Sequence, residues 1–169
     1  MNEFYCPQPW TGGYFTVEKQ SVCCAHGGIK NPSPMNFLKS EHLKDIKKRL
    51  LSGNLDIHCQ RCKDDENNGI ISLRQTLISI QQFRNIQFIK DIDSESIPKA
   101  IEIKFSNLCN FKCRMCSPLW SNLIDKEYKE NPKLIKWYEG STLLQQEVGH
   151  QVVNKNFVDE IISFLPNLK

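Results

Sequence analysis

The sequence has no hydrophobic run that approaches the roughly 18 residues of a membrane-spanning helix. Its first ten residues, MNEFYCPQPW, lack the basic and then apolar profile of a signal peptide. The net charge of +3 is too small to indicate a nucleic-acid partner, and we find no glycine loop for phosphate. These absences favour a cytoplasmic protein of one or two small domains that binds neither membranes nor nucleic acid.

Cysteine, in contrast, is abundant, since the chain of 169 residues holds eight. Without an export signal we expect a reducing compartment, where clustered cysteines bind metal more often than they form disulfides. A secreted, disulfide-rich domain is the alternative, because export can occur without a recognisable signal.

Three cysteines lie in the segment CNFKCRMC: Cys109, Cys113 and Cys116. They follow a run at 101–106 in which apolar and polar residues alternate, as in a strand. Three thiolates on one loop can hold three irons of a 4Fe-4S cluster and leave the fourth iron open to a ligand. Ser117 and Pro118 then predict the start of a helix that reaches about Glu130.

The segment IEIKFSNLCNFKCRMCSPLWSN resembles the cluster-binding motif of the radical S-adenosylmethionine (radical SAM) superfamily. The resemblance implies that the three cysteines ligate a 4Fe-4S cluster whose open iron binds S-adenosylmethionine. Reductive cleavage of this cofactor yields a 5'-deoxyadenosyl radical, which abstracts hydrogen from the substrate. Asn110, Phe111 and Met115 are then expected at the cofactor, although the family usually has an aromatic residue at the position of Met115. No catalytic residue is identified.

The resemblance also implies an electron donor such as flavodoxin or ferredoxin, and a substrate that can be a peptide or a protein. It predicts that residues 101–169 form the first βα unit of a partial TIM barrel. At roughly 30 residues per βα unit, a six-unit barrel needs on the order of 190 residues. We therefore expect an incomplete barrel, an N-terminal fragment of a radical SAM enzyme with little turnover by itself.

The other five cysteines lie in the first part of the chain. The β-rich run at 14–18 and a return strand at 21–25 predict a hairpin, and the return strand carries Cys23 and Cys24. Adjacent residues of a strand face opposite sides, so only one of these two can share a site with Cys6. We favour Cys23.

Cys59 and Cys62 form a C-x2-C knuckle, a spacing that lets two sulfur atoms converge on one metal. Together with FYCPQPW, a hairpin ending in CC, LLSG and CQRCKDDENNGIISLR, this knuckle resembles the auxiliary-cluster modules called twitch or SPASM-like domains, over roughly residues 4–75. Where related modules usually have glycine in the hairpin turn, this chain has Glu18 and Lys19.

The resemblance implies a second iron-sulfur cluster on four thiolates: Cys6, Cys23, Cys59 and Cys62. Zinc is the alternative, because the same four cysteines equally suit a structural zinc site, and the chain would then be a non-catalytic metal-binding module. His26 or His58 could replace one thiolate. Glu66 and Arg74 can pair or close this site, although surface roles are the simpler interpretation.

Two helices are predicted inside the module. Ser40 caps the first, which ends at Gly53 and has Leu43, Ile46 and Leu50 on one face. The second spans 70–83. A last helix begins at Asn156 and ends at Pro166.

The predicted fold class is α+β or an α/β fragment, with a small cysteine-rich module of a β-hairpin and helices before the first barrel unit. The polar segment at 91–100 is the linker. It separates the auxiliary module, residues 1–90, from the truncated barrel, residues 101–169.

Overall fold

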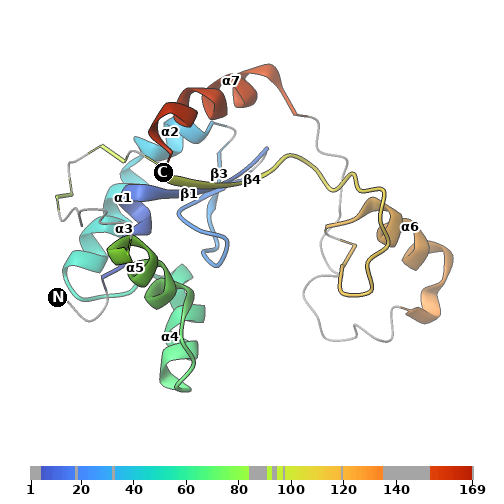
Figure 1. Ribbon diagram of the computed structural model, residues 1–169, viewed down its shortest axis with the longest axis horizontal. Helices are drawn as coiled ribbons and strands as arrows, with labels where there is room; N and C mark the ends of the chain where they lie inside the picture. Colours follow the sequence, from blue (N-terminus) through green and yellow to red (C-terminus); the bar gives the residue numbers. More distant parts are fainter. Residues whose placement is uncertain are drawn as a thin grey trace. The chain divides into compact units, whose positions relative to one another are not determined.

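The fold was obtained as a computed structural model of the chain (Figure 1). The structure describes residues 5–17, 19–31, 33–83, 91–92, 95–96, 98–118, 120–134 and 153–168, without the side chains of 81–83. The described residues form helices and one four-stranded sheet. The chain is therefore an α+β protein, as its sequence predicts at that level.

The sheet has the strand order β3-β2-β1-β4. Its strands are β1 (Gly12–Thr16), β2 (Lys19–Ser21), β3 (Ile29–Lys30) and β4 (Ala100–Lys104). β1 and β2 are antiparallel, with Phe15 opposite Gln20, and β2 and β3 are also antiparallel. The strand predicted at 101–106 is confirmed as β4, which lies at the sheet edge beside β1.

The hairpin is confirmed, but its predicted return strand at 21–25 is wrong. β2 begins at Lys19, because the Thr16 hydroxyl accepts a hydrogen bond from Lys19 N at 2.9 Å and tightens the turn. The buried Gln20 amide donates to the carbonyl oxygens of Thr16 (2.8 Å) and Asn31 (2.7 Å), which fixes the register on both sides. Cys23 therefore lies in the turn after β2 and not in a strand.

Six helical segments precede β4 in the described part of the chain. They are α1 (Gln8–Thr11), α2 (Pro34–Leu38), α3 (Glu41–Leu51), the 3-10 turn η1 (Ile57–Cys59), α4 (Gln60–Asn67) and α5 (Leu73–Phe83). The prediction for α3 is confirmed: Ser40 Oγ accepts from Leu43 N at 3.2 Å, and Gly53 has a φ of 81°. α5 begins three residues later than predicted, because Ser72 Oγ accepts from Gln75 N at 3.2 Å and starts the helix there.

Two helices follow β4: α6 (Asn122–Glu130) and α7 (Lys155–Phe164), which continues into the 3-10 turn η4 (Leu165–Asn167). Both N-caps differ from the prediction. Ser121 and not Ser117 caps α6, because the carbonyl of Ser117 closes a separate turn onto Ser121 N at 3.1 Å. Asn154 and not Asn156 caps α7, where its Oδ1 accepts from Phe157 N at 2.8 Å.

The chain divides into two compact units, residues 1–103 with 154–169, and residues 104–153. These ranges differ from the predicted ones, because β4 joins the sheet of the first unit and α7 packs on it. Phe164 of α7 is buried with its ring centroid 5.7 Å from that of Phe15 in β1, and α7 lies beside α2 in Figure 1. The roles predicted for the two parts, an auxiliary metal module and a truncated barrel, stay predictions.

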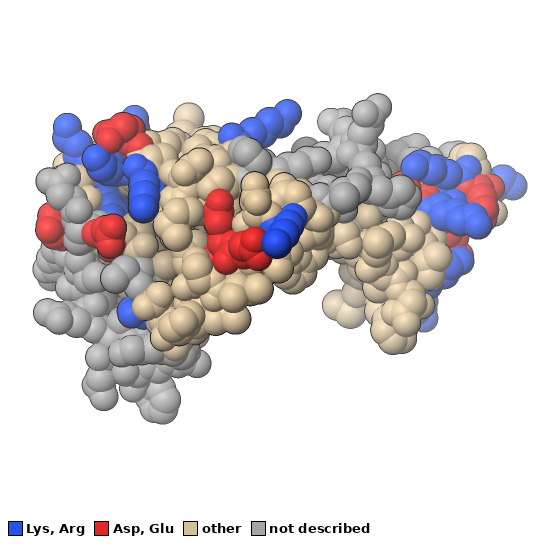
Figure 2. Space-filling view, turned by 90° about the horizontal axis from the view of Figure 1, so that it is seen from above, with Lys and Arg blue, Asp and Glu red and all other residues tan. Residues whose placement is uncertain are grey.

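No helix in the described part of the chain is long and apolar enough to cross a membrane. Charged side chains of both signs are interspersed on the face seen in Figure 2. On α6, for instance, Lys129 Nζ lies 2.7 Å from Asp125 Oδ2, and Lys126 pairs with Glu130 at 3.8 Å. Such exposed pairs contribute little to stability.

Candidate metal centre

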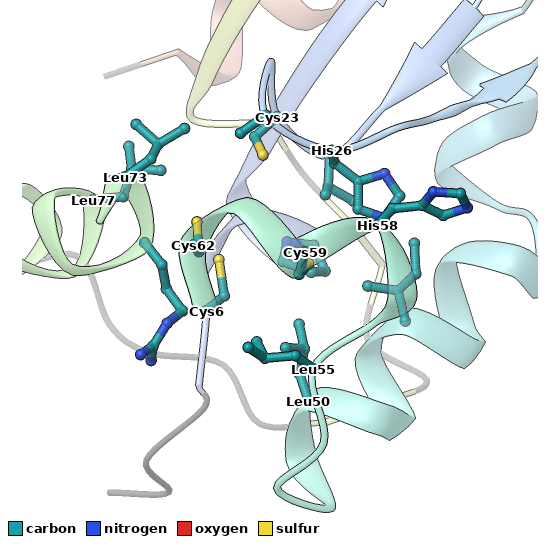
Figure 3. Close-up of a pocket in the computed structure, with 15 residues that line it drawn as sticks. Cys6, Cys23, His26, Leu50, Leu55, His58, Cys59, Cys62, Leu73 and Leu77 are labelled. Atoms are coloured by element: carbon teal, nitrogen blue, oxygen red, sulfur yellow. The ribbon is translucent and has the colours of Figure 1, made fainter. Parts of the chain in front are cut away.

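One pocket of the first unit brings four predicted ligands together: Cys6, Cys23, Cys59 and Cys62. Figure 3 shows these side chains around one space, with leucine side chains from α3 and α5 among the other residues that line it. The pocket therefore combines sulfur donors with an apolar wall. Cys24 stays outside it.

Each thiol is placed by a short local feature. Cys6 directly precedes Pro7, the N-cap of α1, and Cys23 lies in a turn that His26 N closes onto Cys23 O at 3.2 Å. Cys59 ends η1 and caps α4, and Cys62 follows three residues later in that helix. Residues three apart share one side of a helix, so the C-x2-C spacing presents both sulfur atoms to the pocket.

Burial makes these thiols poor acids. Burial, with a smaller contribution from neighbouring thiols, raises the pKa of Cys23 to about 11 and that of Cys59 to about 12. The pKa of Cys6 is raised as well, first by burial. These three sulfur atoms are protonated at neutral pH, so a metal ion that binds them must displace their protons.

Cys23 and Cys24 are adjacent but have different surroundings. Cys24 is exposed, and its pKa is raised first by its partial burial and then by a hydrogen bond with Glu102. Cys23 lines the pocket with the other three thiols. This arrangement supports the choice of Cys23 as the ligand, which stays a prediction.

His26 is occupied by other partners. Its Nδ1 accepts a hydrogen bond from Gly28 N at 3.0 Å, which leaves the ring proton on Nε2, 3.1 Å from Asp56 Oδ1. Burial lowers the pKa of His26 to about 4 although Asp56 opposes that shift, so the ring is neutral at pH 7. With both nitrogens engaged, His26 fits a structural role better than a ligand role. The exposed His58 remains an alternative ligand.

The donor set fits a thiophilic metal centre, because four cysteines face one largely apolar pocket. Among the residues that the structure describes, no group of three or more His, Cys, Asp or Glu side chains stands in metal-binding geometry. The thiols therefore line the pocket without converging on one point, and a bound metal or cluster must draw them together. All eight cysteines are free of disulfides.

The other three cysteines lie on the loop between β4 and α6. Cys113 is exposed and Cys109 and Cys116 are half-buried. Cys116 N donates to Cys113 O at 3.0 Å, which folds the last part of the loop into a tight turn. The loop therefore leaves its cysteines at least partly accessible to solvent.

The first turn of α6 holds this loop in place. Asn122 Oδ1 accepts from Cys109 N at 2.9 Å, and Asn122 N donates to Asn107 O at 2.8 Å. Ser121, which is fully buried, donates from its hydroxyl to Phe111 O at 3.1 Å. The residues that hold the loop thus come from the helix that follows it.

The side chains expected at the cofactor are all exposed. Met115 is 100% exposed and Phe111 is 64% exposed, and Asn110 is exposed beside them in the chain. Large apolar side chains in water are a surface that a bound molecule can cover. Their contact with S-adenosylmethionine stays a prediction.

Comparisons with models of protein families, with curated proteins and with solved structures found no match for this chain. The resemblance of its cysteine segments to radical SAM proteins therefore rests on the sequence. A function has to be argued from the pocket and the cysteine loop.

Two residues around the cysteine sites, Asp56 and Ser121, have roles that the sequence analysis does not predict. Asp56 caps η1, and the pattern of a short acidic residue before a turn could have indicated it. Ser121 could have been found from Asp125 four residues later, since acidic residues favour the first turn of a helix. Arg74 and Glu66, by contrast, are named above as a possible pair, and they do form an ion pair, although surface roles are the simpler interpretation of the sequence and Arg74 is only 6% exposed.

Proposed function

We propose that this chain is an iron-sulfur protein of the radical SAM type. Cys109, Cys113 and Cys116 are the ligands of a 4Fe-4S cluster that leaves one iron open. The observation that carries the proposal is the accessible loop of three cysteines between β4 and α6. Reductive cleavage of S-adenosylmethionine to a 5'-deoxyadenosyl radical is the chemistry that such a cluster supplies when bound.

The chain's own residues position and cover this site. Asn122 and Ser121 hold the loop by hydrogen bonds to the backbone of Cys109 and of Phe111. Phe111 and Met115 offer apolar surface to the adenosine part of the cofactor, and a thioether can pack on a ring. A flavodoxin or a ferredoxin supplies the electron, and the substrate is a peptide or a protein.

The pocket of Cys6, Cys23, Cys59 and Cys62 is the site of a second iron-sulfur cluster in this proposal. Its four thiolates would each bind one of the four irons of a 4Fe-4S cluster, so no iron is left open at this site. It then serves electron transfer or stabilises the fold, and the two sites have different tasks. The cytoplasm is the location in this proposal, because its reducing conditions keep such thiols free to bind metal.

Anaerobic reconstitution with iron and sulfide tests the proposal. We expect the electron paramagnetic resonance spectrum of the reduced protein to change when S-adenosylmethionine is added, because the cofactor binds the open iron. Cys113→Ser should abolish this change and leave the signal of the second cluster. A wild-type spectrum that is unaltered by the cofactor would count against the radical SAM assignment.

A zinc-binding module without catalysis is the second candidate. The observation that favours it is the set of four thiols in one pocket, which suits a closed tetrahedral zinc site as well as a cluster. Metal and sulfide analysis of protein purified without oxygen distinguishes the two. Zinc without iron or sulfide supports the module, and iron with equimolar sulfide supports the clusters.

A further inference from the structure

The four pocket cysteines come from three chain segments, those of Cys6, of Cys23 and of the Cys59–Cys62 knuckle, and buried polar side chains join these segments in pairs. The Arg74 clamp consists of Arg74, Glu66 and Ser72 with the backbone carbonyl of Tyr5. The Asp56 clamp consists of Asp56 and His26. Each clamp links two segments that carry a pocket cysteine.

The Arg74 clamp joins the segment of Cys6 to the helix of Cys62. Arg74 Nη1 donates to the carbonyl oxygen of Tyr5 at 3.0 Å, and Tyr5 directly precedes Cys6. The rest of the guanidinium forms a fork on Glu66, with Nε 3.0 Å from Oε1 and Nη2 bonded to Oε2. Ser72 Oγ also donates to Glu66 Oε1. Because Glu66 lies one turn after Cys62 in α4, the fork fixes that helix relative to Cys6.

Glu66 is ionised within this clamp. Burial alone opposes its charge, but the hydrogen bonds from Arg74 and Ser72 outweigh burial and lower its pKa. The planar fork of an arginine meets both oxygen atoms of a carboxylate, which a lysine cannot reproduce. The clamp therefore fixes the orientation of the Glu66 carboxylate relative to Arg74 as well as the distance between them.

The Asp56 clamp joins the turn of Cys23 to the turn of Cys59. Asp56 Oδ1 accepts from His58 N at 2.9 Å and so caps η1, which ends at Cys59. The same oxygen lies 3.1 Å from His26 Nε2. His26 N in turn donates to Cys23 O. The buried carboxylate thus bridges two turns that are 30 residues apart in the chain.

Neither clamp is explained by stability alone. The ion pair of Arg74 and Glu66 gains little over apolar packing, since the cost of removing charges from water offsets their attraction. In the Asp56 clamp the neutral His26 forms a hydrogen bond and not an ion pair. What such groups do well is fix the position of the backbone that they bond. Both clamps act on backbone next to a cysteine or on the helix that carries one.

We infer that the two clamps are positioning elements of the metal centre, which hold Cys6 near Cys62 and Cys23 near Cys59 before a metal binds. The inference rests on the proposed four-thiolate site. A preorganised site binds metal more tightly than one that has to assemble, because less ordering remains for the binding step. Breaking either clamp therefore weakens metal binding although all four thiols remain.

The test uses the full chain with Cys109, Cys113 and Cys116 changed to serine, so that metal binds only at the pocket. Co²⁺ is the probe, because thiolate-to-cobalt absorption bands report how many thiolates bind. Arg74→Lys keeps the charge but loses the fork. His26→Asn is too short to reach Asp56, whereas His26→Gln retains a donor at the position of Nε2.

We expect Arg74→Lys and His26→Asn to weaken Co²⁺ binding by about 10-fold to 100-fold, as the loss of residues around metal ligands does elsewhere. His26→Gln should restore most of the affinity. The control is Glu130→Gln, which removes an exposed ion pair of α6 and should change nothing.

The outcomes distinguish a failure of the proposed metal centre from a failure of the clamp inference. If the parent protein shows no thiolate-to-cobalt bands, the metal centre itself is absent and the inference falls with it. If the parent binds Co²⁺ through its thiolates and the two clamp variants, shown to be folded by circular dichroism, bind it equally well, the clamp inference alone is overturned. If one of the two clamp variants is unfolded, the Co²⁺ affinity of the other variant decides whether the clamp inference holds.

Discussion

Cys23 and Cys24 show how one position in the chain decides the role of a thiol. Cys23 lines a pocket with three other cysteines, whereas Cys24 is exposed and forms a hydrogen bond with Glu102. The sequence expectation that only one of them faces the site relied on strand alternation. The structure reaches the same division through a turn, because the strand ends at Ser21.

We predict that Cys23→Ser lowers the metal bound at the pocket and that Cys24→Ser does not. A serine hydroxyl is a poor ligand for a thiophilic metal, so the loss of Cys23 leaves only three good donors. Iron or zinc per chain, measured after anaerobic loading in the background without the three loop cysteines, gives the answer. Equal losses in both variants would contradict the assignment of Cys23.

At the scale of elements, the cysteine loop depends on the helix that follows it. Asn122 binds the backbone of Cys109, and Ser121 both caps α6 and bonds the backbone of Phe111. The sequence placed the helix start at Ser117 and Pro118, so it missed these contacts. A serine before proline satisfies the pattern of a cap, but the competing turn at 117–121 was not visible in the local pattern.

We predict that Asn122→Ala speeds the loss of iron from the loop cluster to a chelator. It leaves Cys109 N without its acceptor, and a hydrogen bond of this kind contributes net about 1 kcal/mol, or roughly a fivefold change. Asn131→Ala is the matched control, since Asn131 lies at the other end of α6 and its side chain bonds only Glu127 O among the contacts described.

The measurement is the decay of the cluster absorbance under anaerobic conditions. Reconstitution at the pocket cysteines should be unaffected, so its signal serves as an internal reference. Identical decay in the Asn122 and Asn131 variants would show that the first turn of α6 does not hold the loop.

At the scale of the whole molecule, α7 returns to the unit that begins the chain. Glu160 accepts hydrogen bonds from Ser33 Oγ at 2.9 Å and from Met35 N at 2.8 Å, at the N-terminus of α2. The buried side chains of this helix are Phe157, Ile161 and Phe164. The sequence predicted this last helix but assigned it to a barrel, because a helical pattern does not show which part of the fold the helix packs on.

We predict that Phe164→Ala destabilises the first unit by about 3 kcal/mol or more, as the removal of a buried phenylalanine does. Phe164 is 4% exposed and contacts Phe15, whereas the next residue, Leu165, is 53% exposed. Leu165→Ala should therefore cost much less. Urea denaturation is followed by tryptophan fluorescence with Trp120 and Trp137 changed to phenylalanine, so that the signal reports on Trp10 in this unit. Equal midpoints for the two variants would refute the packing of α7.

The sequence by itself determined the features that depend on neighbours in the chain. The cap at Ser40, the stop at Gly53 and the apolar face of α3 are local, as is the C-x2-C spacing that presents Cys59 and Cys62 on one side. Local hydrogen bonds and side-chain periods fix such features with little help from distant residues.

Only the tertiary structure decided which distant segments meet. It brought Cys6 and Cys23 to the knuckle, put β4 beside β1, and bridged the turns of Cys23 and Cys59 through Asp56. Contacts between residues far apart in the chain depend on how loops close and on which apolar faces pack together, and a short sequence pattern contains neither.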